Sequence, residues 1–166
     1  PYTAIIGGSK VSTKIEVLKQ LSNIADNIVI AGAMANTFMV AKGINMQKSL
    51  FEQEQVLEAK NIMGNSKAKI ILPLDFLASV DINTNGQNYE VLPDGYSAFD
   101  IGENSVKQIM NVLSNTKTIL WYGALGAFVF CNFNKSSKVL SEYISQLTKK
   151  LGVVSVIGGG ETVASI

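Results

Sequence analysis

Short apolar segments alternate along this chain with segments of helical periodicity, and this alternation constrains the possible folds more than any other feature. The apolar segments are residues 2–6, 27–31, 69–72, 118–121 and 153–157. The helical segments are residues 11–25, 33–42, 53–63, 103–113 and 136–150. Continuous apolar strands that alternate with helices form parallel sheets covered on both faces. The sequence therefore predicts an α/β fold of three layers.

The middle of the chain departs from this alternation and predicts a small β-hairpin insertion. Residues 76–82 and 89–92 have the composition of strands, and they flank Asn83-Thr84-Asn85-Gly86. An Asn-Gly pair between two such runs is a strong hairpin signal. Asp100, which precedes Ile101-Gly102, is interpreted as a turn residue.

Lysine supplies all 14 basic residues, and the chain contains no arginine and no histidine. Histidine acid–base chemistry and bidentate arginine clamps on phosphate are therefore excluded. Hydrophobic residues make up 47% of the 166 residues, which predicts one globular domain over residues 1–166. A net charge of +1 argues against electrostatic capture of nucleic acid.

The composition also bears on location. No apolar run approaches the roughly 20 residues that cross a bilayer, and no N-terminal signal pattern is present. The single cysteine, Cys131, excludes an internal disulfide and fits a reducing compartment. We therefore expect a cytoplasmic protein with no membrane partner.

Two glycine clusters follow the first and the last apolar segments. One cluster is Gly7-Gly8-Ser9-Lys10, and the other is Gly158-Gly159-Gly160-Glu161-Thr162. A strand–glycine–helix junction lets backbone N–H groups approach an anion at the positive end of a helix dipole. Two such junctions predict a site for a phosphorylated ligand, most simply a nucleotide. The alternative is that the glycines only make tight turns.

Charged and hydroxyl side chains beside these clusters are candidates for phosphate chemistry. Lys10 and Lys14 share one face if both are helical, and lysine can hold phosphoryl oxygens as a point charge. Glu161 could hold a magnesium ion, and the Thr162 hydroxyl could reach phosphate. The alternatives are two solvated lysines and an ordinary helix cap. Asp75, which ends a strand at the same edge, is either a supporting acid or a turn residue.

Two common nucleotide motifs are absent. No G-x-G-x-x-G follows the first apolar segment, and no acid ends the second, residues 27–31. No G-x-x-x-x-G-K-[ST] occurs anywhere. Neither a simple dinucleotide site nor a P-loop is therefore expected.

Several motifs in order along the chain resemble the C-terminal, nucleotide-binding domain of phosphoglycerate kinase. They are residues 4–14 (AIIGGSKVSTK), 30–38 (IAGAMANTF), 71–75 (ILPLD), 99–102 (FDIG), 121–128 (WYGALGAF) and 156–162 (VIGGGET). The resemblance implies a Rossmann-like sheet that binds MgADP or MgATP. It also implies phosphoryl transfer between ATP and the carboxylate of 3-phosphoglycerate in glycolysis.

The same resemblance assigns expected roles to individual residues. Lys14 would steady the transferring phosphoryl group, and Lys10 would lie near the phosphates. Gly32 and Phe99 would border the adenine. The expected nucleotide site comprises Gly7, Gly8, Ser9, Gly32, Ala33, Phe99, Tyr122, Gly123, Ala124, Val129, Gly158, Gly159, Gly160 and Thr162, with Glu161 as a weakened candidate for magnesium.

Five positions depart from the family pattern, and all of them fall on the expected nucleotide cleft. Where the family has W-N-G-P, this chain has Tyr122 in place of the asparagine and Ala124 in place of the proline. Val129 stands where the family has a ribose-binding glutamate, Glu161 replaces an aspartate, and Ala33 replaces a glycine. These changes predict weak or absent nucleotide binding. The alternative is a binding domain for an apolar small molecule, natural or engineered.

The family's N-terminal domain, which binds 3-phosphoglycerate through arginine and histidine, has no counterpart in this sequence. Phosphoryl transfer depends on holding donor and acceptor together. We therefore expect no kinase turnover from this chain alone. We also expect the chain to be a monomer.

Overall fold

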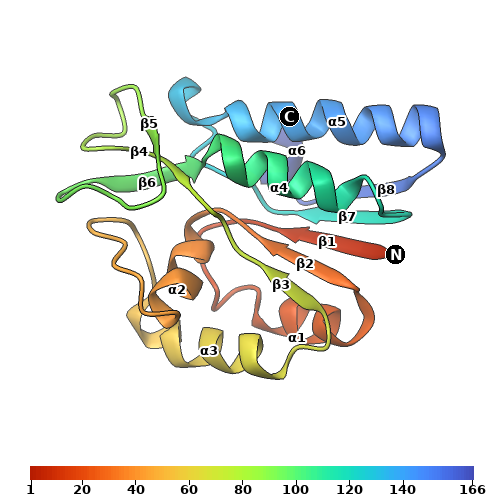
Figure 1. The fold of residues 1–166 in the computed structure, drawn as a ribbon, viewed down its shortest axis with the longest axis horizontal. Coiled ribbons are helices and arrows are strands. Elements are labelled where there is room, and N and C mark those ends of the chain that lie inside the picture. The colour runs from red at the N-terminus through yellow and green to blue at the C-terminus, as the bar shows by residue number, and fades with distance from the viewer.

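A parallel sheet of five strands forms the centre of the computed structural model, which describes residues 1–166 (Figure 1). The strand order is β3-β2-β1-β7-β8, and every neighbouring pair is parallel. The strands are β1 (Tyr2–Ile6), β2 (Asn27–Ile30), β3 (Lys69–Ile71), β7 (Thr118–Tyr122) and β8 (Val154–Gly158). The predicted parallel sheet with helices on both faces is confirmed.

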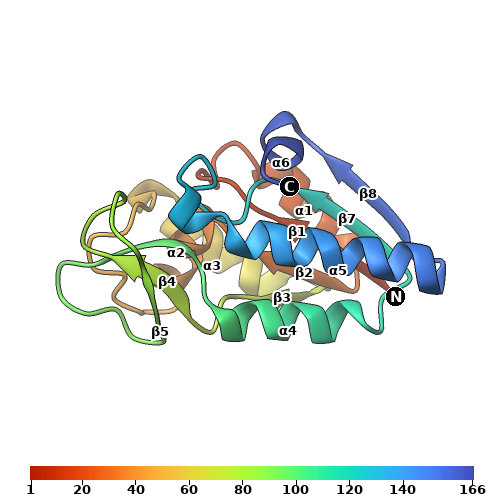
Figure 2. The same ribbon diagram turned by 90° about the horizontal axis from the view of Figure 1, so that it is seen from above.

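Helices cover both faces of this sheet. One layer contains α1 (Ile15–Ile24), α2 (Ala33–Ala41) and α3 (Val56–Asn65), and the other contains α4 (Glu103–Leu113) and α5 (Lys135–Leu151). Figure 2 shows α4 and α5 side by side across the sheet. A short helix, α6 (Gly160–Ala164), follows β8, and two 3₁₀ turns, η1 (Gln53–Gln55) and η2 (Cys131–Phe133), precede α3 and α5. None of the helices has the length and apolar composition that a membrane crossing needs.

Alternation along the strands divides the core into two layers. In β1, Ala4 and Ile6 pack with α1, α2 and α3, whereas Ile5 packs with α4 and α5. Successive strand residues point to opposite faces, so a strand buried on both sides must be apolar throughout. The helices complete each layer with residues at helical spacing, such as Leu18 and Leu21 of α1.

The predicted hairpin is one part of a three-stranded antiparallel sheet. Its strands β4 (Phe76–Ser79) and β5 (Gln87–Tyr89) pair, and β6 (Ser97–Ile101) lies along the other edge of β4. The interpretation of Asp100 as a turn residue is wrong, because it lies within β6 and is buried. Its partner strand lies about twenty residues away in the sequence, so local turn signals could not locate this strand.

The helix that was predicted over residues 11–25 begins later, at Ile15. Residues 11–14 form turns, and Lys14 is the N-cap of α1. The Thr13 hydroxyl donates to the carbonyl of Lys10, and the Ser12 hydroxyl donates to Glu52. The Thr13 hydroxyl satisfies the local backbone outside a helix, as Thr commonly does, and the Ser12 hydroxyl ties the turn to Glu52. Lys10 and Lys14 therefore do not share a helical face.

Three loops at the carboxyl ends of β1, β2 and β7 meet backbone to backbone, and we call this contact the glycine crossing. The Gly8 N–H donates to the Ala124 carbonyl over 2.9 Å, and the Gly32 N–H donates to the Leu125 carbonyl over 2.9 Å. A Cβ on Gly32 would lie 2.4 Å from the Gly8 carbonyl oxygen, and φ there is +70°. Only glycine fits both the space and the backbone conformation.

The glycine crossing can be tested with a matched pair of alanine substitutions. Gly43 also has a positive φ, +84°, but a Cβ there would contact nothing within 4 Å. Gly43→Ala should lower the free energy of unfolding by about 1–2 kcal/mol, the cost of the left-handed conformation. Gly32→Ala should lower it by about 3–5 kcal/mol, because overpacking adds to that cost. Urea unfolding followed by circular dichroism measures both, and equal losses would contradict the close contact.

Candidate functional site

A cleft of about 550 Å³ opens beside the glycine crossing, between the start of α2 and strand β6. Parallel sheets of this kind bind ligands outside the carboxyl ends of their strands, where the strand order reverses. Here β1 lies between β2 and β7, so the reversal falls at the loops that form the cleft. The cleft is large enough for a small organic ligand.

Some of the residues that were predicted for the site line this cleft. They are Gly8, Ser9, Gly32, Ala33, Phe99, Ala124, Val129 and Glu161. The others, Gly7, Lys10, Lys14, Tyr122, Gly123, Gly158, Gly159, Gly160 and Thr162, lie outside its lining. The cavity thus gathers Gly32 and Phe99, which were expected beside the adenine, together with Gly8, Ser9 and Glu161, which were expected along the nucleotide or at the metal. The remaining predicted residues lie on the neighbouring loops.

The sequence interpretation missed several residues of the lining. They include Asn36, Lys48, Leu50, Phe76, Ile82, Ser97, Ala98, Asp100, Ile101, Leu125, Gly126, Ala127 and Phe128. Most of them come from β6 and from the segment after β7, which fold against the cleft through contacts distant in sequence. Asn36 follows the N-terminus of α2 by one turn, and that spacing was the available signal for it.

The backbone N–H groups at the glycine crossing are already engaged within the protein. The Gly7 N–H donates to the Tyr122 carbonyl, and the Gly123 N–H donates to Thr162 Oγ1 over 2.6 Å. The N–H groups of Gly8 and Gly32 also have carbonyl partners. Four N–H groups that a glycine-rich loop could offer to an anion therefore donate hydrogen bonds within the protein instead. The buried Thr162 hydroxyl ties α6 to the loop after β7.

Among the strands of the parallel sheet, only β2 and β8 are followed by a glycine and then at once by a helix. Gly32 directly precedes α2, and Gly159 directly precedes α6. After Gly7 the chain runs through seven residues, 8–14, before α1 begins at Ile15, so the first cluster is not such a junction. The start of α2 reaches the cleft through Gly32, Ala33 and Asn36.

Lys14 is the cation that the structure places at the glycine crossing. Its Nζ donates to the Gly7 carbonyl oxygen over 3.0 Å and lies 4.0 Å from the centroid of the Tyr122 ring. Burial lowers the pKa of Lys14, and the negative charge of Glu161 opposes that shift. Lys10, in contrast, is exposed and lies outside the lining of the cleft.

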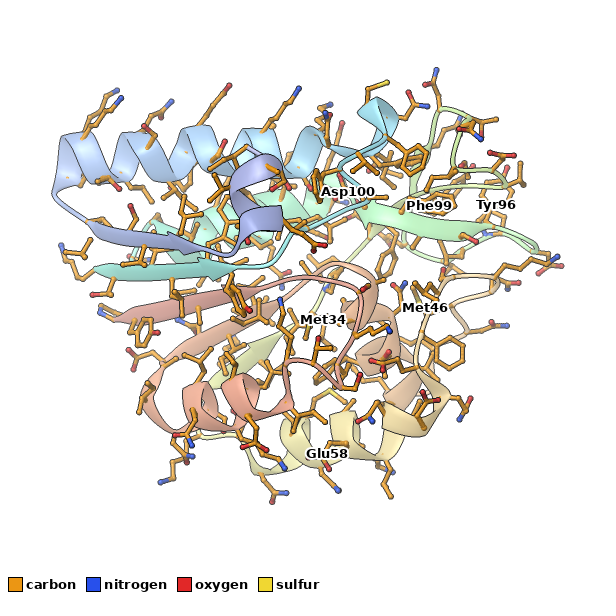
Figure 3. All side chains as sticks on the ribbon, turned by 180° about the vertical axis from the view of Figure 1, so that it is seen from behind. Met34, Met46, Glu58, Tyr96, Phe99 and Asp100 are labelled. Atoms are coloured by element: carbon orange, nitrogen blue, oxygen red, sulfur yellow. The ribbon has the colours of Figure 1, made fainter.

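Asp100 is the buried acid of the cleft, and Figure 3 shows it beside Phe99 on β6. It accepts hydrogen bonds from the Ile101 N–H and from the N–H and hydroxyl of Ser136 at the start of α5. Burial raises the pKa of Asp100 to about 7, although these hydrogen bonds lower it. Asp100 thus joins the small sheet to α5.

Asp75 has a structural role at the start of α4. Its carboxylate accepts hydrogen bonds from the N–H groups of Asn104 and Ser105 and from the Ser105 hydroxyl. These N–H groups belong to the first turn of α4, where no partner exists within the helix. The supporting-acid alternative for Asp75 is therefore not favoured by its position, because it lies outside the lining of the cleft.

The fold and this cleft define the chain as a doubly wound α/β protein with a ligand-sized cleft at the carboxyl ends of its parallel strands. A sequence-family model described as phosphoglycerate kinase matches residues 1–166. The chain belongs to the phosphoglycerate kinase family.

Individual relatives agree with this assignment. The phosphoglycerate kinase of Leuconostoc mesenteroides subsp. mesenteroides is 41% identical over 172 residues, and that of Corynebacterium diphtheriae is 38% identical over 170 residues. Both comparisons cover all of this chain and 42% of the relative, so the chain spans about two fifths of the length of the curated relatives it matches.

Solved structures show the same fold. The phosphoglycerate kinase of Coxiella burnetii superposes with a TM-score of 0.93 at 29% identity, over 99% of this chain and 43% of that one. The enzyme of Pyrococcus horikoshii OT3 superposes with a TM-score of 0.79 at 23% identity, over 99% of this chain and 43% of that one. The second likeness is one of fold.

The raised pKa of Asp100 predicts a pH-dependent stability. Between its ordinary value of 3.8 and about 7, the folded protein holds a proton that the unfolded chain has released. The contribution to the free energy of unfolding is therefore complete below pH 3.8 and is lost as the pH rises to about 7, at about 1.4 kcal/mol per pH unit. Asp100→Asn should remove this slope. Urea unfolding at pH 5 and pH 8 measures it, and parallel profiles for both proteins would contradict the prediction.

Proposed function

We propose that this chain is the nucleotide-binding domain of a phosphoglycerate kinase and that its cleft takes MgADP or MgATP. The observation that carries the proposal is the position of Lys14. Its ammonium group lies over the glycine crossing, beside the cleft, and makes one hydrogen bond of the three it can donate. A phosphate at the mouth of the cleft would find two free N–H donors of the Lys14 ammonium group there.

The chemistry of phosphoryl transfer fits a site built on lysine. The transferring group spreads negative charge over its oxygens, and catalysis consists mainly of positioning and electrostatic stabilisation. Lys14 is assigned the stabilising role, because it is the half-buried lysine at the crossing. Lys10 is assigned a weaker, solvent-screened contribution, because its side chain is exposed.

Glu161 is the residue that would hold magnesium. Magnesium is commonly bound by one or two carboxylates together with substrate phosphates. Glu161 lines the cleft from the first turn of α6, and its negative charge opposes the lowering of the Lys14 pKa by burial. Its position therefore fits that arrangement. When bound, magnesium would neutralise charge on the phosphate oxygens. No group of three or more His, Cys, Asp or Glu side chains lies together in the structure.

The sugar and base side of the cleft supports a weaker affinity than the family pattern implies. Val129 lies at the edge of the cleft with 75% of its surface exposed, and it offers no acceptor for ribose hydroxyls. Ala33 and Ala124 line the cleft with single methyl groups. A lost hydrogen bond to a charged acceptor costs about 1–3 kcal/mol.

A second candidate function is the binding of an apolar small molecule in the same cleft. The observation that favours it is the apolar lining around Phe99, which includes Leu50, Phe76, Ile82 and Phe128. Such a composition is typical of small-molecule sites. Thermal unfolding with MgADP, MgATP and a panel of apolar aromatic compounds separates the two candidates, because a ligand of the folded state raises the unfolding temperature.

The reaction that we propose for the whole protein is phosphoryl transfer between ATP and 3-phosphoglycerate, in the cytoplasm. This domain would supply the nucleotide, and a separate 3-phosphoglycerate-binding domain would be its partner. The 42% coverage of the relatives supports a division of this kind. The net charge of +1 supports neither nucleic acid nor an anionic membrane as a partner.

Restoring the ribose acceptor should strengthen nucleotide binding. Val129→Glu should raise the affinity for MgADP by about 5- to 100-fold, because the new carboxylate can accept hydrogen bonds from the ribose hydroxyls. Val91→Glu is the matched control, since Val91 is 83% exposed and lies outside the cleft. Titration calorimetry measures both variants. Equal affinities for the two would show that Val129 does not face a bound nucleotide.

The chain alone should show no kinase turnover. Donor and acceptor must be held together for phosphoryl transfer, and this chain would hold only the donor. A coupled assay with ATP and 3-phosphoglycerate should therefore stay at the rate of the buffer control. Turnover that Lys14→Met abolishes would contradict this prediction.

A further inference from the structure

The ammonium group of Lys14 has an unusual set of neighbours. No carboxylate lies within ion-pair distance of it, and its single hydrogen bond goes to the Gly7 carbonyl. The Tyr122 ring lies beneath it, with 4.0 Å between Nζ and the ring centroid. A cation over the face of a tyrosine is attracted by the ring quadrupole, and the attraction grows when the cation is partly desolvated. Lys14 meets that condition because it is half-buried.

The ring of Tyr122 is itself held in place. Tyr122 is the last residue of β7 and pairs with Ile6 on one side and Gly158 on the other. Gly159 follows immediately, and a Cβ there would lie 2.9 Å from the ring carbon Cε2. The absence of a side chain at Gly159 therefore leaves space for the ring. The Tyr122 hydroxyl makes no hydrogen bond, so the ring face is the part of the side chain that acts.

The glycine crossing limits where the Lys14 ammonium can lie. A Cβ on Gly123 would lie 2.8 Å from Nζ, and a Cβ on Gly8 would lie 3.2 Å from it. The ammonium thus rests directly on two glycine turns, with the aromatic ring as its remaining contact. Without the ring, a long lysine side chain would regain its rotamer freedom.

We propose that Tyr122 is a positioning residue, which holds the Lys14 ammonium at the glycine crossing so that its two free N–H donors meet a phosphate anion. The inference rests on the proposed function for the identity of the anion. The family pattern W-N-G-P has an asparagine at this position. In this chain the aromatic ring of Tyr122 takes that position, and its face contacts the Lys14 ammonium group.

The experiment compares two variants of the whole chain. Tyr122→Phe keeps the ring face and removes only the unbonded hydroxyl, whereas Tyr122→Leu removes the face and keeps an apolar side chain. Lysine labelled with ¹³C at the ε position reports the contact, because a ring face shifts the Lys14 resonance upfield. Lys14→Met identifies that resonance, and Tyr143→Leu, on α5, controls for the general loss of a tyrosine.

The expected results are specific. The Lys14 resonance is shifted upfield from those of the exposed lysines in the wild type, Tyr122→Phe and Tyr143→Leu, but not in Tyr122→Leu. The affinity for MgADP falls by about 2- to 30-fold in Tyr122→Leu and stays within 2-fold in Tyr122→Phe and Tyr143→Leu. An unshifted wild-type resonance overturns the proposal without any variant. Equal MgADP affinities in Tyr122→Leu and the wild type also overturn it.

A failure of the proposed function is recognised separately. If no protein binds MgADP, sodium pyrophosphate is the probe, and the change it causes in the Lys14 resonance is the measurement. A change in the wild type and Tyr122→Phe that is absent in Tyr122→Leu supports the positioning role for a phosphate anion other than the nucleotide. No change in the wild type overturns it.

Discussion

The glycine crossing is the contact on which the rest of the site depends. The loops that follow β1, β2 and β7 approach one another closely, and Gly7 would place a Cβ 2.1 Å from the Ala124 carbonyl oxygen. The N–H groups of Gly7, Gly8 and Gly32 are paired with carbonyl oxygens of β7 and the loop that follows it. The crossing fixes the start of α2, part of the lining of the cleft and the position of the Lys14 ammonium group. A side chain on Gly7, Gly32 or Gly123 would lie less than 3 Å from the backbone of a neighbouring loop and would separate the loops.

This use of glycine changes how phosphate can be recognised. A glycine-rich loop offers its N–H groups to an anion only when they are free. Here the N–H groups of Gly7, Gly8, Gly32 and Gly123 have protein partners, so the positive charge of a lysine must supply what the loops do not. The absence of arginine and histidine makes that dependence on lysine complete within this chain. The aromatic neighbour of Lys14 then matters more than a single contact normally would.

The parallel sheet could be predicted because its strands are buried on both faces and so appear as continuous apolar runs, as in residues 27–31. The junction at Gly32 could also be predicted, since this glycine stands between the predicted strand 27–31 and the predicted helix 33–42. Strand β6 and the burial of Asp100 could not be predicted, because both depend on pairing with β4 and on Ser136, far away in sequence. The roles of Lys14 and Tyr122 were named from a resemblance, but their mutual contact required three-dimensional coordinates.

The five departures from the family pattern do not act in one direction. Val129, Ala33 and Ala124 remove polarity or shape from the side of the cleft that would face sugar and base. Tyr122 lies outside that lining and contacts Lys14, so its effect falls on the phosphate side. A ligand that keeps its phosphates but carries a different organic group would lose little at Lys14 and could gain apolar contacts at Phe99. Under the proposed function the changes would therefore separate recognition of phosphate from recognition of the nucleoside, which a uniform decay of the site would not do.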